Sequence, residues 1–252
     1  MINRSDIKPL GRLDAFPGDF TIAIGFADTG HTAGRVRIIV NETLAAVNAV
    51  EPDYRWTCLN GATRRMVPWP GSPEEQTSLV SAAWQDHDKG AVFEHFSLML
   101  EGVNPDGENT LNVRASLGYA EVGKAAPQNV VSVSIPRYTD LGRETARAVL
   151  VQMVERLHPL RGLAAEGDVP DVDVPYWGIP VYPDVYIPWF GEFSRESIRA
   201  PEGVSFVEAG DGVVVSVEEL EDKVAMVHLM ADFLDLNGLE TYPKPESGTE
   251  TP

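Results

Sequence analysis

The sequence has a single cysteine and no long hydrophobic run. Because Cys58 stands alone among 252 residues, no disulfide can form within the chain, which is typical of a reducing compartment. No hydrophobic run approaches the roughly 20 residues that a helix needs to cross a bilayer. Residues 1–8 lack the apolar stretch of a secretion signal. We therefore expect a cytoplasmic protein without membrane contacts, in which Cys58 is a buried free thiol.

Basic residues are also scarce, above all toward the C-terminus. Residues 1–163 carry 19 acidic and 16 basic side chains, whereas residues 164–252 carry 19 acidic and 4 basic ones, so most of the net charge of −18 is C-terminal. This charge repels nucleic acid and anionic membranes and attracts basic proteins. A role in solubility alone is the alternative explanation.

The hydrophobic residues that are present, 43% of the chain, are enough for one large domain or two small ones. The clearest unit is residues 129–160, where apolar residues first alternate, as in a strand, and then recur at three- and four-residue steps, as in a helix. Asp140 is the expected helix cap and Pro159 the stop. Residues 20–26 and the stretch 36–50 repeat this strand-then-helix pattern.

Further elements follow from turns and caps. Ser72, Pro73 and Glu75 form a capping box that predicts a helix to Trp84, and residues 61–71 are expected to be a loop. Residues 91–103 and 111–120 alternate on either side of a Pro-Asp-Gly turn, which predicts a hairpin. A second hairpin is expected at 204–208 and 212–217, and a helix at 218–236 that ends at Gly238.

Together these elements predict an α+β fold of mostly antiparallel sheets covered by helices. The expected organisation is an irregular lead at 1–19, a first half at 20–121, a second half at 129–240 and a disordered tail at 241–252. The similar element order of the halves indicates an internal duplication, either one domain with pseudo-symmetry or two fused copies.

One glycine-containing loop has the place of a phosphate-binding loop. Residues Gly25–Thr32 follow a strand and precede a helix, with G-x-x-x-x-G spacing. The lysine of such loops is missing, His31 is mostly neutral at pH 7, and Asp28 repels phosphate. We therefore predict that Thr32 only caps the following helix, and expect no cofactor.

Other reactive side chains do not form a convincing site. Asp86, His87, Asp88 and His95 are residue types that bind metals, but they lack a second ligand set at fixed spacing, which favours a solvated helix end. The carboxylates Asp184 and Glu192 are only a weak glycosidase-like pair. We expect neither a metal site nor catalytic residues.

The densest aromatic segment lies among acidic residues at 164–193. Its five prolines exclude a helix, although residues 185–189 can form a strand at a sheet edge. Our hypothesis is that this segment and the second hairpin bind a partner through carboxylates and aromatic rings: Asp168, Asp171, Asp173, Tyr176, Trp177, Tyr182, Asp184, Trp189, Glu208 and Asp211. The alternative is an acidic loop that aromatic residues pack for folding alone.

The chain resembles polymorphic-toxin immunity proteins, especially the fifty-second immunity-protein family and its type VI secretion relatives. The resemblance covers residues 18–240 and rests on Trp56, the Ser-Val-Ser-Ile-Pro strand end, Tyr176-Trp177-Gly178 and Tyr186-Ile-Pro-Trp-Phe-Gly191. It implies a non-catalytic α+β protein that blocks a toxin made by the same cell, often a nuclease. Its partner would be a basic toxin whose phosphate site the carboxylates imitate. Two alternatives remain: an enzyme or ligand binder with a pocket between the halves, near His31 or the aromatic segment, and a structural adaptor of a secretion or phage-like assembly.

Overall fold

The computed structural model describes residues 19–26, 31–86, 88, 94–119, 129–136, 139, 141–167 and 183–239. The described strands are β1 (Phe20–Gly25), β2 (Arg55–Asn60), β3 (Arg65–Pro68), β4 (Trp84–Gln85), β5 (His95–Val103), β6 (Thr110–Leu117), β7 (Val130–Ile135), β8 (Arg161–Glu166), β9 (Asp184–Pro188), β10 (Val204–Ala209) and β11 (Gly212–Val217). The helices are α1 (Ala33–Val50), α2 (Pro73–Ala82), α3 (Arg143–Leu157) and α4 (Lys223–Leu236).

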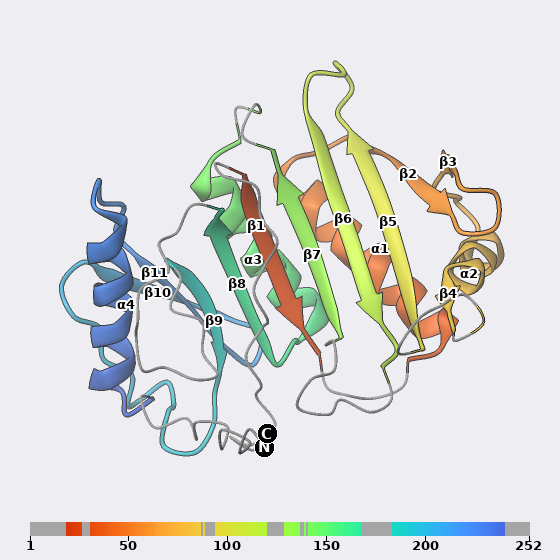
Figure 1. The fold of residues 1–252 in the computed structure, drawn as a ribbon. Coiled ribbons are helices and arrows are strands. Elements are labelled where there is room, and N and C mark those ends of the chain that lie inside the picture. The colour runs from red at the N-terminus through yellow and green to blue at the C-terminus, as the bar shows by residue number, and fades with distance from the viewer. Residues whose placement is uncertain are drawn as a thin grey trace, which may run out of the picture.

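All described strands belong to one 11-stranded sheet, in which every pair is antiparallel (Figure 1). The order is β10-β11-β9-β8-β1-β7-β6-β5-β2-β3, and β4 pairs with β5 off this path. The predicted α+β class with antiparallel strands and helices on the sheet is confirmed.

The two predicted halves meet at β1 and β7 in the middle of this sheet. β1 pairs with β7 on one side and with β8 on the other, so the first strand of the chain lies among strands of the second half. After α1 the chain forms β2 and β3 at one end of the sheet and returns toward the middle through β5 and β6. After α3 it forms β8 beside β1 and then continues through β9 to β10 and β11 at the other end. The halves therefore share one sheet. Their duplication stays a prediction.

α1 and α3 lie side by side on one face of the sheet (Figure 1). Their buried residues are those of the predicted stripes, including Ile39 and Val47 in α1 and Leu150 and Met153 in α3. They pack on the inward residues of the central strands, such as Ile22 and Val133, to form the main core. The helix period of the sequence is therefore explained by burial against this face.

α4 covers the opposite face, at the β9-β11-β10 end. Because neighbouring residues in a strand point to opposite faces, Val214 of β11 joins the main core under α3, while Val213 and Val215 pack with Met230 and Phe233 of α4 in a second core. Asp222 caps α4 by accepting from the backbone N–H groups of Val224 and Ala225. None of the helices in the described ranges is both long and apolar enough to span a membrane.

Several element boundaries differ from the sequence expectation. β3 lies within the expected loop 61–71, and the unpredicted strand β8 follows α3 after three residues. The strand at 184–188 lies inside the sheet between β8 and β11 and not at an edge, so that prediction is wrong. All five residues of β9 are buried, because α3 and α4 cover its two faces. α4 begins at Lys223 and not at 218, since Asp222 is its cap.

Candidate partner-binding surface

Four of the ten predicted contact residues can be placed. Asp184, Trp189, Glu208 and Asp211 are described. The other six lie outside the described residues and stay predictions: Asp168, Asp171, Asp173, Tyr176, Trp177 and Tyr182.

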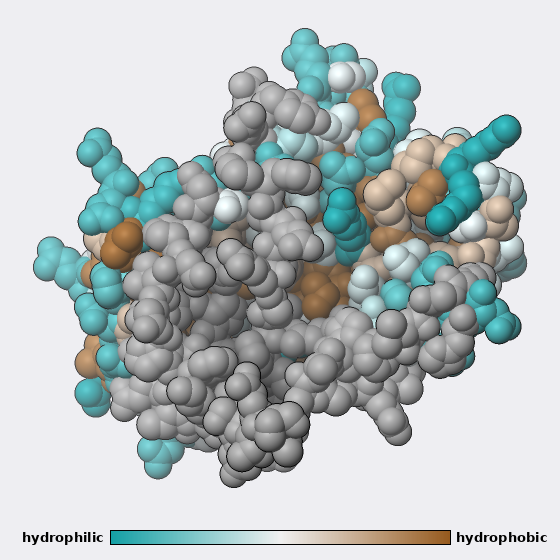
Figure 2. All heavy atoms as spheres, in the orientation of Figure 1, coloured by the Kyte–Doolittle hydropathy of each residue, from teal (hydrophilic) through white to brown (hydrophobic). Residues whose placement is uncertain are grey.

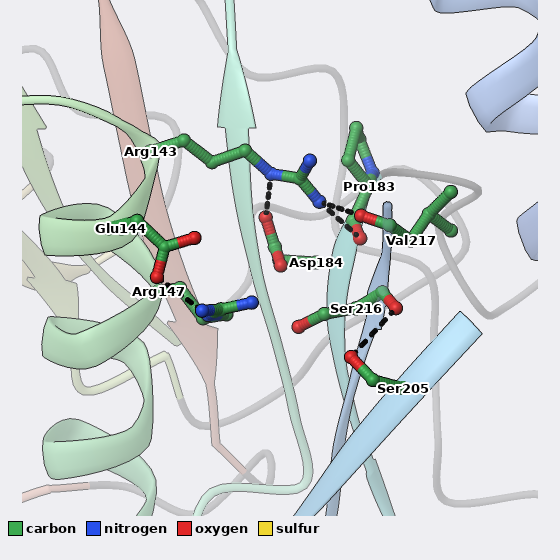
Figure 3. Close-up of polar contacts among 8 residues, drawn as sticks. All are labelled: Arg143, Glu144, Arg147, Pro183, Asp184, Ser205, Ser216 and Val217. Atoms are coloured by element: carbon green, nitrogen blue, oxygen red, sulfur yellow. Dashed lines mark hydrogen bonds and ion pairs between the residues drawn. The ribbon is translucent and has the colours of Figure 1, made fainter. Parts of the chain in front are cut away.

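Asp184 begins β9 and is buried, with its side chain 1% exposed. Arg143, the first residue of α3, donates from Nε to Asp184 Oδ2 at 2.7 Å and from Nη2 to the carbonyl oxygens of Pro183 and Val217 (Figure 3). The other carboxylate oxygen, Oδ1, is buried and has no hydrogen-bond partner among the described residues. This carboxylate thus joins α3 to β9 and β11, and it cannot contact a partner at the surface. Placing Asp184 on the binding edge was therefore wrong.

Trp189 lies directly after β9 and is half-buried. It packs against the second core, with its ring centroid 5.2 Å from that of Phe193. Phe190 and Phe193, from the same aromatic segment, are buried in that core. For these described rings, packing under α4 is the observed role, as in the alternative interpretation of the segment.

Glu208 and Asp211 are both exposed on the β10–β11 hairpin. Glu208 forms an ion pair with Arg195, whose Nε is 2.7 Å from Glu208 Oε1. Asp211, in the hairpin turn, has Oδ2 3.3 Å from Nδ1 of His158, which ends α3. Of the described predicted residues, these two are accessible to a partner.

A groove runs between α3 and the β10–β11 hairpin. It comprises two adjoining cavities of about 460 and 440 Å³, which share Glu144, Arg147 and Ser205 in their linings. Val151 of α3 and Val207 of β10 give the first cavity an apolar part. Figure 3 shows Glu144 and Arg147 projecting from α3 near Ser205 and Ser216 of the hairpin, and Glu144 and Arg147 form an ion pair. The sequence did not predict this groove, because its two sides come from segments some 60 residues apart.

β10 exposes apolar side chains on both of its faces. Phe206 is 39% exposed and Val207 is 56% exposed. In a strand these neighbours point to opposite sides of the sheet, so Val207 faces the groove and Phe206 faces the side of α4. The sequence held one signal of this, because Phe206 and Val207 are adjacent apolar residues and neighbours in a strand point to opposite faces.

The last described segment of the chain, which supplies one side of this groove, concentrates negative charge. Residues 183–239 hold 12 acidic and 3 basic side chains, net −9. All of the acidic ones except Asp184 are exposed. Glu218 and Glu219, which line the second cavity, continue this charge from the end of β11. The C-terminal acidity predicted from the sequence is therefore presented at the surface, and Glu218 and Glu219 bring part of it to the groove.

The glycine-containing loop is described only at its ends. Thr32 caps α1 by accepting from the N–H of Arg35 at 3.3 Å, which confirms the predicted cap. Burial lowers the pKa of His31, and the positive charge of the nearby Arg35 lowers it further by a smaller amount. Asp28 lies outside the described residues.

The candidate metal ligands do not form a cluster in the part of the chain that is described. His87 is outside it, and His95 stacks on Tyr119 with 4.5 Å between ring centroids. Within the described ranges no three His, Cys, Asp or Glu side chains are arranged to hold a metal ion.

A further hollow lies on the sheet face opposite α1 and α3. It measures about 420 Å³ and lies over β5 and β6, with Met99, Arg64 and Arg114 in its lining. Figure 2 views the molecule from this side, where described hydrophobic and hydrophilic residues are mixed. Both of its charged lining residues are arginines, whereas the groove beside α3 is lined by Arg143 and Arg147 together with Glu144, Glu218 and Glu219, so the groove suits a basic partner better.

Comparison of the sequence with protein-family models gives no match, and comparison with curated proteins gives none. Among solved structures, the chain is similar to a T6SS protein of Pseudomonas aeruginosa, over 86% of this chain and 75% of that one. The TM-score is 0.47 and the sequence identity is 14%. A likeness this distant concerns shape only, and no function follows from it.

Proposed function

We propose that this chain is a non-catalytic, acidic immunity protein that binds and neutralises a basic bacterial toxin. The observation that carries the proposal is the exposed charge of residues 183–239, the end of the sheet where a groove with apolar parts is lined by Glu218 and Glu219. Charge of one sign speeds the approach of an oppositely charged protein, and apolar contacts at the centre then slow dissociation. The groove supplies both ingredients in one place.

The distribution of charge favours a specific surface over a general role in solubility. The described residues from 19 to 167 carry 15 acidic and 10 basic side chains, net −5, although they outnumber residues 183–239. A charge that served solubility alone would have no reason to gather at one end of the sheet. A nuclease or another toxin that acts on phosphate must present basic residues, and carboxylates can occupy the same positions.

The first test is neutralisation in cells. The toxin domain encoded next to this chain's gene is expressed under an inducible promoter, with and without this protein. Restored growth together with co-purification of the two proteins is the expected result. Growth arrest that continues despite folded protein, or no complex between the purified proteins, would reject the immunity function.

A second test locates the surface by charge reversal. The double variant Glu218→Lys/Glu219→Lys should weaken binding about tenfold or more and flatten the salt dependence, since exposed charges act within a Debye length of about 8 Å at physiological salt. Asp106→Lys/Glu108→Lys, at the exposed β5–β6 turn, changes the net charge equally and is the matched control. Isothermal titration at low and high salt measures both. Equal losses in the two variants would show that only net charge matters.

A further inference from the structure

The outer edge of β10 is an open site for backbone pairing. β10 ends the sheet, and no described strand pairs with its outer side. Ala209 pairs with Gly212 across the two-residue turn Gly210–Asp211. In such a hairpin the residues that flank the turn exchange both backbone hydrogen bonds, and bonded pairs recur at every second residue. Ser205, Val207 and Ala209 therefore pair with β11.

Phe206 and Glu208 consequently direct their backbone groups away from β11. The N–H of Glu218 donates to the carbonyl of Gly203 at 2.7 Å. Gly203 is two residues before Ser205, so this bond continues the series of residues that bond to β11 and supports the assignment. Each of these two residues offers one N–H and one C=O to an added strand. The N–H of Val204 bonds to Pro201, so the open stretch begins after it.

The edge strands at the two ends of the sheet, β3 and β10, differ in length and in composition. Natural edge strands avoid unwanted pairing by being short, by carrying charged residues, above all lysine, or by containing proline. β3, at the other end, has four residues, begins with Arg65 and ends with Pro68. β10 has six residues without lysine, arginine or proline, and it exposes Phe206 and Val207. β10 thus lacks the short length, the arginine and the proline of β3, and its one charged residue is Glu208.

We propose that β10 binds an extended segment of a basic partner protein, which adds to the sheet as a further antiparallel or parallel strand. On the groove side its side chains would lie on Val207 and near Glu218 and Glu219. On the α4 side its cationic side chains would lie near Glu208, which pairs with Val213 of the second core. This inference rests on the proposed function, because it names the way in which the toxin is held. It goes further in assigning the contact to backbone groups of Phe206 and Glu208.

Charge decides between a partner protein and a second copy of this chain. Pairing of β10 with its own copy would bring together two sheet ends that each carry a net charge of −9 over residues 183–239. Like charges placed across a strand pair oppose each other. A segment with lysine or arginine has the opposite effect, so the heterologous pairing is favoured.

A proline substitution tests the backbone pairing. Phe206→Pro removes the outward N–H without removing a bond to β11, and Phe206→Ala removes the same side chain but keeps the N–H. The probe is the catalytically inactivated toxin domain encoded by the adjacent gene. We expect Phe206→Pro to weaken its binding about tenfold or more beyond Phe206→Ala, since a partner carbonyl loses its donor. Met66→Ala, 40% exposed on the opposite edge strand, should leave the affinity unchanged.

Amide hydrogen exchange of the unsubstituted protein is a direct second measurement. The amides of Phe206 and Glu208 should exchange rapidly in the free protein and slow at least about tenfold in the complex, whereas those of Ser205 and Val207 are protected in both. This readout remains decisive if Phe206→Pro fails to fold.

The outcomes separate this inference from the proposed function. Binding that is unaffected by Phe206→Pro, or unchanged exchange at Phe206 and Glu208 in the complex, overturns the strand addition and leaves the immunity function standing. A wild-type protein that binds no toxin domain overturns both. A wild-type dimer that Phe206→Pro dissociates, measured by sedimentation without partner, overturns the inference in favour of pairing between copies.

Discussion

The Arg143–Asp184 pair allows a quantitative prediction about stability. Arg143 is 12% exposed and Asp184 1% exposed, and the guanidinium also donates to the carbonyl oxygens of Pro183 and Val217. In Arg143→Met the carboxylate stays buried without its counter-charge, and its Oδ1 already lacks a hydrogen-bond partner among the described residues. Removing one member of a buried ion pair costs about 3–5 kcal/mol. We expect a loss of that size in the free energy of unfolding.

A second substitution separates the charge from the other contacts. In Arg143→Met/Asp184→Asn no uncompensated charge is buried, so the double variant should be more stable than Arg143→Met alone, while the carbonyls of Pro183 and Val217 still lack their donor. Arg147→Met, four residues along α3, breaks an exposed pair with Glu144 and should cost less than about 1 kcal/mol.

Urea unfolding followed by circular dichroism measures all of these variants, with the midpoint and the slope fitted separately. The reasoning would be refuted if Arg143→Met cost no more than Arg147→Met. It would also fail if adding Asp184→Asn made Arg143→Met less stable, because the penalty would then not come from a buried charge.

Two further predictions concern the core and the sheet. Burial raises the pKa of the Cys58 thiol to about 11, so the protonated form dominates at pH 8. Since the thiolate is the reactive form, the native protein should react with iodoacetamide far more slowly than the urea-unfolded chain until the pH approaches that value; equal rates at pH 8 would contradict the burial. Gly212→Ala places a Cβ that overlaps the carbonyl oxygen of Ile187 and lies 2.6 Å from the Cα of Pro188, so β9 and β11 must separate at a cost of about 1–3 kcal/mol. Gly71→Ala, with open space around its Cβ, should change the thermal midpoint little, and a similar midpoint for both alanine variants would speak against the close approach of these strands.

Local sequence patterns predicted most of the elements because their signals lie within a few residues of one another. The alternation at 129–136 and the helical stripe after it appear as β7 and α3, and Ser72 caps α2 with Glu75, as the capping box predicts. Asn104 accepts from the N–H groups of Glu108 and Asn109 in the predicted β5–β6 turn. β8 was missed because Arg-Gly-Leu-Ala-Ala-Glu does not alternate, since the strand is buried over nearly its whole length.

The candidate site was less predictable from the sequence. Counting acidic residues located the excess negative charge in the C-terminal part of the chain. It did not show which carboxylates are buried and which are exposed. Asp184 is buried against Arg143, 41 residues earlier, whereas Glu208 and Asp211 are exposed on the last hairpin. Nothing near Asp184 in the sequence marks its partner, because pairing across that separation depends on how α3 packs on β9.

The sequence by itself determined most of the strands and helices, the caps of α1 and α2 and the C-terminal excess of carboxylates, because hydrogen bonds within turns and the periods of strand and helix are local properties. It did not determine the cap of α3, which is Gly142 and not Asp140. Only the tertiary structure decided that β1 lies within the second half, that Asp184 is buried, and that the β10–β11 hairpin ends the sheet beside α3. The physical reason is that strand order and burial follow from which apolar faces are covered together, and this depends on residues far apart in the chain.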